Sequence, residues 1–146
     1  ILSQVSDATG TEVKGDWKQV NLKGYGKYHL ENSRSRAGEY VKFNFDTKAL
    51  PGKYKAYYYY PKSNSNTPAV ELEVFNGKEV KPLTLNLKDV EILGQTTSTW
   101  VEIGDFDFDF ASNPYIKVIS GAKNSNDLDL DKINVIANAI LLVPDN

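Results

Sequence analysis

Hydrophobic and polar residues alternate with a period of two along most of the chain. In residues 39–45, Val41, Phe43 and Phe45 fall on one face of an extended segment, and the residues between them fall on the other. Residues 70–74 repeat this pattern. Such alternation is typical of a β-strand with one buried face, and no segment shows the 3.6-residue period of an amphipathic helix. The pattern therefore predicts an all-β protein.

Turn signals separate the predicted strands. Pro51-Gly52 predicts a turn before a strand over residues 53–60, because proline fixes φ and glycine accepts positive φ. Asn76-Gly77 predicts a hairpin with a type I′ turn, and Pro82 places the returning strand at a sheet edge or a bulge. Further strands are expected at 99–103, 105–110, 115–120 and 133–143, the last apolar on both faces and therefore central. About nine strands at this spacing predict an antiparallel β-sandwich.

Length and composition suit a single module over residues 1–146. Apolar residues make up 40% of the chain and charged residues 25%, with a net charge of −2, so composition forces neither disorder nor an electrostatic partner. The 17 basic residues are scattered and outnumbered by 19 acidic ones, which argues against nucleic acid as a partner. No apolar run is long enough for membrane insertion.

The chain has no cysteine and no methionine, and we expect it to be a fragment of a larger multidomain protein.

Tryptophan and tyrosine recur beside glycine at the starts of predicted strands. The blocks are Gly15-Asp16-Trp17, Gly24-Tyr25-Gly26, Pro51-Gly52-Lys53-Tyr54 and Thr99-Trp100-Val101, and the apolar run 135–143 follows them. Their order and spacing resemble the golvesin C-terminal or xanthan-lyase-type carbohydrate-binding-like domain over residues 13–143.

This resemblance implies a jelly-roll β-sandwich of the galactose-binding-like type. It also implies a non-catalytic accessory module that tethers an attached catalytic domain of the parent chain to polysaccharide or oligosaccharide. The setting would be bacterial and extracytoplasmic: secreted, periplasmic or on the cell surface. The chain carries Asn138-Ala139 where the family usually has Asp-Ala, and we expect the Asn138 side chain to satisfy a buried backbone group.

Four consecutive tyrosines occupy the strand predicted over residues 53–60. Alternation places Tyr58 and Tyr60 on one face and Tyr57 and Tyr59 on the other, so one pair is expected to be exposed. Two rings about 7 Å apart along a strand face are able to stack on successive sugar rings. We therefore expect Tyr57 and Tyr59 to bind ligand. The alternative is that all four tyrosines pack, two in the core and two beneath a loop or a neighbouring domain.

A second candidate site is a long loop region expected from Gly24 to Gly38. Its candidate ligand-binding residues are Tyr25, Tyr28, His29, Arg34 and Arg36. The planar guanidinium of arginine suits bidentate binding of a carboxylate, sulfate or phosphate, so an acidic glycan is one ligand to consider. The alternative is a structural role, in which glycine and tyrosine help the chain cross the end of the sandwich.

Acidic residues form two further groups. Asp105, Asp107 and Asp109 alternate with phenylalanines, as expected of a solvated strand face over a phenylalanine core. A denser group of oxygen ligands comprises Asn124, Asn126, Asp127, Asp129 and Asp131. Its last four members are candidate ligands of a structural calcium ion, although the glycine and the distal glutamate of an EF-hand loop are missing. No other cofactor is expected.

Catalysis finds little support in the sequence. A nucleophilic hydrolase is disfavoured because the chain has no cysteine, one histidine and no nucleophile-elbow glycine pattern. Carboxylates for a glycosidase are plentiful, and a lyase could use Tyr28 or His29 with Arg34. Three hypotheses follow: a carbohydrate-binding module, a docking domain that packs against its parent enzyme without touching glycan, and a small polysaccharide lyase or glycosidase domain. The first is favoured, and the fragment is not expected to be an enzyme.

Overall fold

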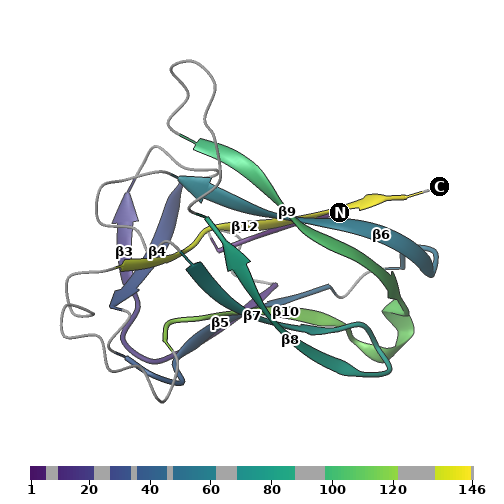
Figure 1. Cartoon of the computed structure of the whole chain (residues 1–146), viewed down its shortest axis with the longest axis horizontal. Coiled ribbons are helices and arrows are strands. Elements are labelled where there is room, and N and C mark those ends of the chain that lie inside the picture. Colours follow the sequence, from purple (N-terminus) through teal and green to yellow (C-terminus); the bar gives the residue numbers. More distant parts are fainter. Residues whose placement is uncertain are drawn as a thin grey trace.

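The computed structural model is an antiparallel β-sandwich, which confirms the predicted fold class (Figure 1). It describes residues 1–5, 10–21, 27–33, 36–45, 48–61, 69–87, 98–121 and 134–145. These residues hold twelve strands rather than about nine. The difference arises mainly near the amino terminus, where short strands carry too few residues for a clear alternation.

The strands form three sheets. The four-stranded sheet contains, in spatial order, β1 (Leu2–Gln4), β12 (Ala139–Pro144), β6 (Gly52–Pro61) and β9 (Ser98–Phe108). The five-stranded sheet contains β2 (Thr11–Lys14), β5 (Tyr40–Asn44), β10 (Tyr115–Ile119), β7 (Ala69–Phe75) and β8 (Val80–Asn86). A small sheet of β11 (Asn134–Ala137), β4 (Tyr28–Ser33) and β3 (Lys18–Asn21) lies at one end of the molecule (Figure 1). A short 3₁₀ turn, η1 (Phe110–Ser112), follows β9.

The core lies between the inner faces of the two larger sheets. The five-stranded sheet contributes Val41, Phe43, Val70, Leu72, Val74, Ile116 and Val118, and the four-stranded sheet contributes Ala56, Tyr58, Phe108, Ile140 and Leu142. Val41 and Phe43 have no exposed surface, as the alternation in residues 39–45 predicts. Alternation therefore fixes which face of each long strand enters the core.

Two tyrosine hydroxyls inside the sandwich have backbone partners. Tyr58 is buried and donates a hydrogen bond to the carbonyl of Ile136 in the small sheet. Burial raises the pKa of Tyr58 far above its ordinary value, because the interior disfavours the charged phenolate. Tyr54 donates to the carbonyl of Leu50 at 2.8 Å. These bonds let polar aromatic side chains fill the core without an unsatisfied hydroxyl.

The segment over residues 133–143 is not the single central strand that the sequence predicts. It divides at Asn138 into β11 and β12, which belong to different sheets. Asn138 is completely buried, and its side-chain amide donates to the carbonyl of Tyr28 at 3.3 Å. Its own carbonyl accepts from the Val5 amide at 2.9 Å. The expectation that Asn138 satisfies a buried backbone group is confirmed, and this residue links two sheets.

The β7–β8 hairpin differs from the predicted type I′ turn at Asn76-Gly77. Asn76 N donates to the carbonyl of Glu79 at 3.3 Å, which makes Gly77 and Lys78 the central turn residues. Gly77 has a φ of +107°, whereas Lys78 is not among the described residues with positive φ, so the type I′ prediction is wrong. The Asn76 side chain accepts from the amides of Lys78 and Glu79, both at 2.9 Å, and this moves the turn by one residue. The predicted edge position of β8 is confirmed.

Residues 99–103 and 105–110 do not form two separate strands. They belong to one continuous strand, β9, as far as Phe108, after which Asp109 is the N-cap of η1 and Phe110 lies in η1. A β-bulge interrupts the register, so that Ala56 pairs with Gly104 whereas Tyr57 pairs with Glu102. A bulge of this kind lets a long strand bend and twist without ending.

Candidate functional site

The outer face of the four-stranded sheet carries the first candidate site. Tyr58 and Tyr60 are buried on the inner face, whereas Tyr57 and Tyr59 point outward and are only partly buried. The predicted division of the four tyrosines between the two faces is therefore confirmed. Their role in ligand binding stays a prediction.

Strand register places further side chains beside these two tyrosines. Tyr57 pairs with Glu102 of β9 on one side and with Leu141 of β12 on the other. Tyr59 pairs with Trp100, and their rings meet edge to face with centroids 4.9 Å apart. Paired residues project from the same face of a sheet, so these side chains form one surface. We call Tyr57, Tyr59 and Trp100 the aromatic strip.

Charged groups border the aromatic strip on one side. Lys55 Nζ lies 3.1 Å from Glu102 Oε1. The hydrogen bond with Glu102 raises the pKa of Lys55 above its ordinary value, and the negative charges of Glu102 and Asp105 add to this effect. A partly exposed tyrosine ring therefore lies next to groups that donate and accept hydrogen bonds.

Apolar side chains border the strip on the other side. Leu2 pairs with Leu141 across the β1–β12 ladder, and Val143 pairs with Lys55. Leu2 is 39% exposed and Val143 40% exposed. This face of the sandwich is consequently more apolar than a purely solvated strand face.

The outer face of the five-stranded sheet also carries tyrosines, but its own lysines cover them. Lys117 Nζ lies 4.2 Å from the ring centroid of Tyr40, and Lys42 Nζ lies 4.5 Å from that of Tyr115. Lys117 also pairs with Glu73 at 3.3 Å, and the Tyr115 hydroxyl donates to Glu73 at 2.8 Å. Burial, and then the bond to Glu73, raises the pKa of Tyr115 to about 12. Cation–π contacts and ion pairs thus occupy the aromatic faces here.

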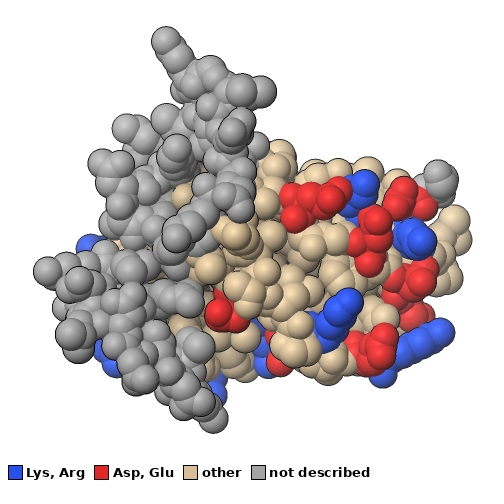
Figure 2. Space-filling model, in the orientation of Figure 1, with Lys and Arg blue, Asp and Glu red and all other residues tan. Residues whose placement is uncertain are grey.

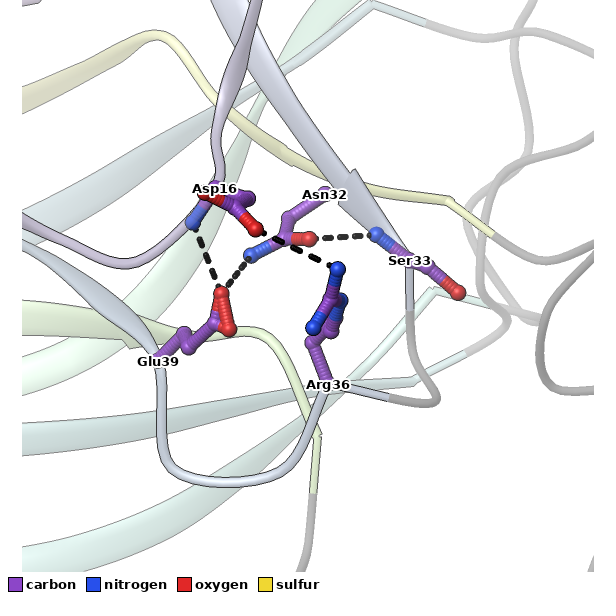
Figure 3. A network of polar contacts seen from close by, with 5 residues as sticks. All are labelled: Asp16, Asn32, Ser33, Arg36 and Glu39. Atoms are coloured by element: carbon purple, nitrogen blue, oxygen red, sulfur yellow. Dashed lines mark hydrogen bonds and ion pairs between the residues drawn. The ribbon is translucent and has the colours of Figure 1, made fainter.

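A polar cleft of about 320 Å³ is the second candidate site. Figure 3 shows some of the residues that line it, together with their polar contacts. It lies where β4 ends and where β3 and β11 begin. Its lining consists of Asp16, Lys18, Glu31, Asn32, Ser33, Arg36 and Asn134. Arg36, a residue that the sequence singles out, thus reaches a cleft formed by four separate segments of the chain.

Two other predicted ligand residues lie in a strand rather than in a loop. Tyr28 and His29 belong to β4, so the expectation of a continuous loop from Gly24 to Gly38 is wrong. The Tyr28 hydroxyl donates to the carbonyl of Val5 at 3.1 Å. His29 is 7% exposed, and its Nε2 lies 2.9 Å from Glu31 Oε1. The Tyr28 bond ties β4 to the segment after β1, whereas the His29 contact lies within β4 itself.

The remaining predicted site residues lie outside the described residues. They are Tyr25 and Arg34 in the second candidate site, and Asn126, Asp127, Asp129 and Asp131 in the candidate calcium site. Among the described residues, no group of three or more histidine and acidic side chains is placed to hold a metal ion. The calcium site therefore stays a prediction.

The surface charges of the described residues are mixed in sign. Asp105 and Asp107 are exposed while Phe108 is buried, as the alternation predicts, and Asp109 instead caps η1 by accepting from the Ala111 amide at 3.1 Å. Acidic and basic side chains are interspersed on the face shown in Figure 2. No helix within the described ranges is both long enough and apolar enough to cross a bilayer.

The fold identifies the class of protein. It is an antiparallel β-sandwich of the galactose-binding-like, jelly-roll type, with aromatic side chains on an outer sheet face. A family comparison matches residues 1–143 to the Golvesin C-terminal domain, so the chain belongs to the Golvesin C-terminal domain family. This confirms the resemblance seen in the sequence. A search of curated proteins found no match.

Solved structures share the fold at low sequence identity. A xanthan lyase from Paenibacillus aligns with a TM-score of 0.77 and 21% identity over 99% of this chain, which spans only 13% of the lyase chain. A family 35 carbohydrate-binding module from an environmental isolate aligns with a TM-score of 0.64 and 14% identity, covering 99% of this chain and 93% of that one. A third structure is a family 35 module in complex with a glucuronic acid-containing disaccharide. It has a TM-score of 0.59 and 14% identity, covering 100% and 94% of the two chains.

Proposed function

We propose that this protein is a non-catalytic carbohydrate-binding module that tethers an attached enzyme to polysaccharide. Two of the similar structures are carbohydrate-binding modules that align over nearly their whole length. The observation that carries the proposal is the aromatic strip, in which the partly exposed ring of Tyr57 lies beside the polar pair of Lys55 and Glu102. Tyr57 and Tyr59 are the main proposed ligand contacts.

The chemistry of this surface suits a sugar ring. The C–H face of a pyranose is apolar and packs on a flat aromatic ring, while its equatorial hydroxyls need hydrogen-bonding partners. Tyr57 supplies the ring, and the ammonium of Lys55 and the carboxylate of Glu102 supply the partners at its edge. Tyrosine adds a contact of large area at a low cost in conformational entropy, because it has only two rotatable side-chain bonds.

The contrast between the two outer sheet faces supports the choice of the aromatic strip as the proposed site. On the five-stranded sheet, lysines lie over the rings of Tyr40 and Tyr115. The nearest lysine to Tyr57 in the ladder, Lys55, is instead engaged by Glu102. A sugar would therefore have to displace ion-paired lysines on the first face, whereas no lysine of the described residues lies over the ring of Tyr57.

The tethering role is part of the same proposal. This chain spans a small part of the xanthan lyase chain that it resembles, which supports the idea that family members are attached to enzymes. A module bound to polysaccharide raises the local concentration of substrate around an attached active site. We propose a secreted, periplasmic or surface setting in a bacterium, where polysaccharide is available.

The test is calorimetric titration of the isolated domain against a panel of neutral and acidic polysaccharides. Tyr57→Ala should weaken binding by about five- to 150-fold, since a stacked aromatic contributes about 1–3 kcal/mol. Tyr40→Ala is the matched control, because it removes the same side chain from the opposite outer face. Loss of binding in Tyr40→Ala but not in Tyr57→Ala would refute the proposed site, and no binding to any polysaccharide would refute the function.

The exposed aliphatic side chains favour one other candidate, a docking domain. Leu2 and Val143 lie on the same face as Tyr57 and resemble an interface with another protein domain more than a sugar site. The occupant would be the neighbouring domain of the parent chain. Hydrogen exchange compared between the isolated module and its parent protein tests this idea. Protection around Leu2 and Val143 in the parent alone, without polysaccharide binding, would favour docking.

A further inference from the structure

The polar cleft has a rigid wall that does not depend on a ligand. Glu39 Oε1 accepts from the Asp16 amide at 2.7 Å and from the side-chain amide of Asn32 at 3.4 Å. The Asn32 side-chain carbonyl in turn accepts from the Ser33 amide at 2.8 Å. Figure 3 shows these groups converging from three segments. Asn32 is only 5% exposed, so its orientation is fixed by packing as well as by hydrogen bonds.

The segment that carries Arg36 is also anchored. The hydroxyl of Ser120, in the segment after β10, donates to the Arg36 carbonyl, and the Ser120 amide donates to the Glu39 carbonyl at 2.9 Å. The Arg36 amide donates to the Ser33 carbonyl at 3.0 Å. The backbone of this wall is therefore held at both ends, while the guanidinium reaches outward.

The charges that line the cleft balance one another. Two cations, Lys18 and Arg36, face two carboxylates, Asp16 and Glu31. Arg36 Nη2 lies 3.2 Å from Asp16 Oδ2, and Glu31 is bound to His29. Among the described residues of the lining, positive charge is thus not in excess, which argues against the acidic ligand that arginine alone suggests. A neutral ligand carries no such electrostatic requirement.

Hydrogen-bonding capacity remains in the lining after these contacts. Arg36 uses one of its five N–H donors in the described contacts with Asp16, and Lys18 forms no ion pair with any described residue. Both residues are exposed. Amide, guanidinium and carboxylate groups each present two polar atoms in one plane, an arrangement that matches adjacent hydroxyls of a sugar. The volume is at the lower end of ligand pockets, which suits one ring rather than an extended chain.

We infer that the polar cleft is a second binding site, for a single neutral pyranose unit. The inference rests on the proposed carbohydrate-binding function but uses none of the residues of the aromatic strip. A polysaccharide could then contact the module at two separate places, and two weak sites acting together bind more tightly than either alone.

The test is a two-dimensional NMR titration of the ¹⁵N-labelled domain with methyl glycosides of glucose, mannose, galactose and xylose. At least one should shift the backbone amides of Asp16 and Ser33 and the side-chain amide of Asn32, with a dissociation constant of about 1–10 mM. Arg36→Ala should weaken this binding about tenfold, because a hydrogen bond to a charged group is lost. The variant should fold normally, since an exposed ion pair contributes little to stability. Lys78→Ala, an exposed cation in the β7–β8 turn, is the matched control.

Two further ligands, sorbitol and glucuronate, and a titration of the Tyr57→Ala variant distinguish the possible outcomes. Sorbitol, an open-chain polyol, should give no saturating shifts, and high salt should leave glycoside binding nearly unchanged. Shifts that appear only with glucuronate and vanish at high salt would overturn the inference, as would the absence of shifts or binding unaffected by Arg36→Ala. The titration is repeated in Tyr57→Ala, where cleft binding should persist. If the aromatic strip proves not to bind polysaccharide, the titration of Tyr57→Ala still tests glycoside binding in the cleft independently.

Discussion

Gly15 lies directly against the carboxylate of Glu39. A Cβ atom at residue 15 would lie 2.2 Å from Glu39 Oε1, and the φ of Gly15 is +105°. The β2–β3 connection can therefore pass over Glu39 only with glycine at this point. This contact couples the backbone before Asp16 to the hydrogen bonds that shape the polar cleft.

Gly15→Ala should destabilise the domain by about 1–3 kcal/mol from backbone strain, with a further loss because Glu39 must move. Urea unfolding followed by tryptophan fluorescence measures the change. Gly38→Ala is the control, because Gly38 also has positive φ, +82°, but a Cβ there would meet nothing within 4 Å. Equal losses in the two variants would show that strain alone matters and that the Glu39 contact contributes nothing.

Tyr58→Phe should lower the free energy of unfolding at neutral pH by about 1–3 kcal/mol. The variant removes the hydrogen bond to the Ile136 carbonyl and leaves that acceptor buried without its partner. Tyr57→Phe removes a hydroxyl from the outer face of the same strand and should have almost no effect. Chemical denaturation of both variants checks the prediction, and a larger loss in Tyr57→Phe would contradict it.

The domain should lose stability as the pH rises above about 10. An unfolded tyrosine ionises near pH 10.0, whereas Tyr115 in the folded domain ionises near pH 12 and the pKa of Tyr58 is also strongly raised. Above pH 10 the unfolded chain therefore binds fewer protons than the folded one, so unfolding becomes more favourable, by up to about 1.4 kcal/mol per pH unit for Tyr58. Below pH 10 this contribution is fully present.

Denaturation curves measured across this pH range, compared with those of Tyr58→Phe and Tyr115→Phe, test the assignment. Each variant should show a weaker fall in stability with pH than the unmodified domain. An unchanged slope in Tyr58→Phe would mean that other groups cause the alkaline loss.

Glu102→Gln should lower the pKa of Lys55 toward its ordinary value of 10.5. The reason is that the hydrogen bond and charge of Glu102 are the largest causes of the upward shift. NMR titration of the Lys55 side-chain methylene signals measures the pKa. Glu79→Gln removes a carboxylate elsewhere and should leave Lys55 unchanged. An unaltered pKa of Lys55 in Glu102→Gln would show that the Lys55–Glu102 ion pair does not form in solution.

Much of the fold could be predicted because alternation is a local signal. The inner and outer faces of β5, β6 and β7 follow directly from their sequences. Alternation could not reveal the division at Asn138, because residues on both sides of it are apolar and the break depends on bonds to Tyr28 and Val5. The position of the hairpin turn likewise depends on where the Asn76 side chain bonds.

The candidate sites show the same limit more strongly. Tyr57 and Tyr59 could be placed outward from the sequence, but their neighbour Trp100 depends on strand register across a bulge. In the sequence, Trp100 is marked only as one of the aromatic residues that begin predicted strands, and this pattern gives it no role in binding. The polar cleft joins residues from four segments, and of its lining the sequence singles out only Arg36 as a candidate ligand residue. Local patterns thus predict faces of strands, while sites that span strands require the register.

The pairing of β1 with β12 has a mechanical consequence. These strands run antiparallel, with Leu2 opposite Leu141, and the Ile1 amino group donates to the Leu142 carbonyl at 2.8 Å. A pull that separates the two ends of the described chain would break the three-residue β1 ladder one pair at a time, as a zipper opens, rather than shear all its bonds together. β12 remains paired with β6 from Ile140 to Pro144, so β1 would yield first under flow while the core of the sandwich stays folded.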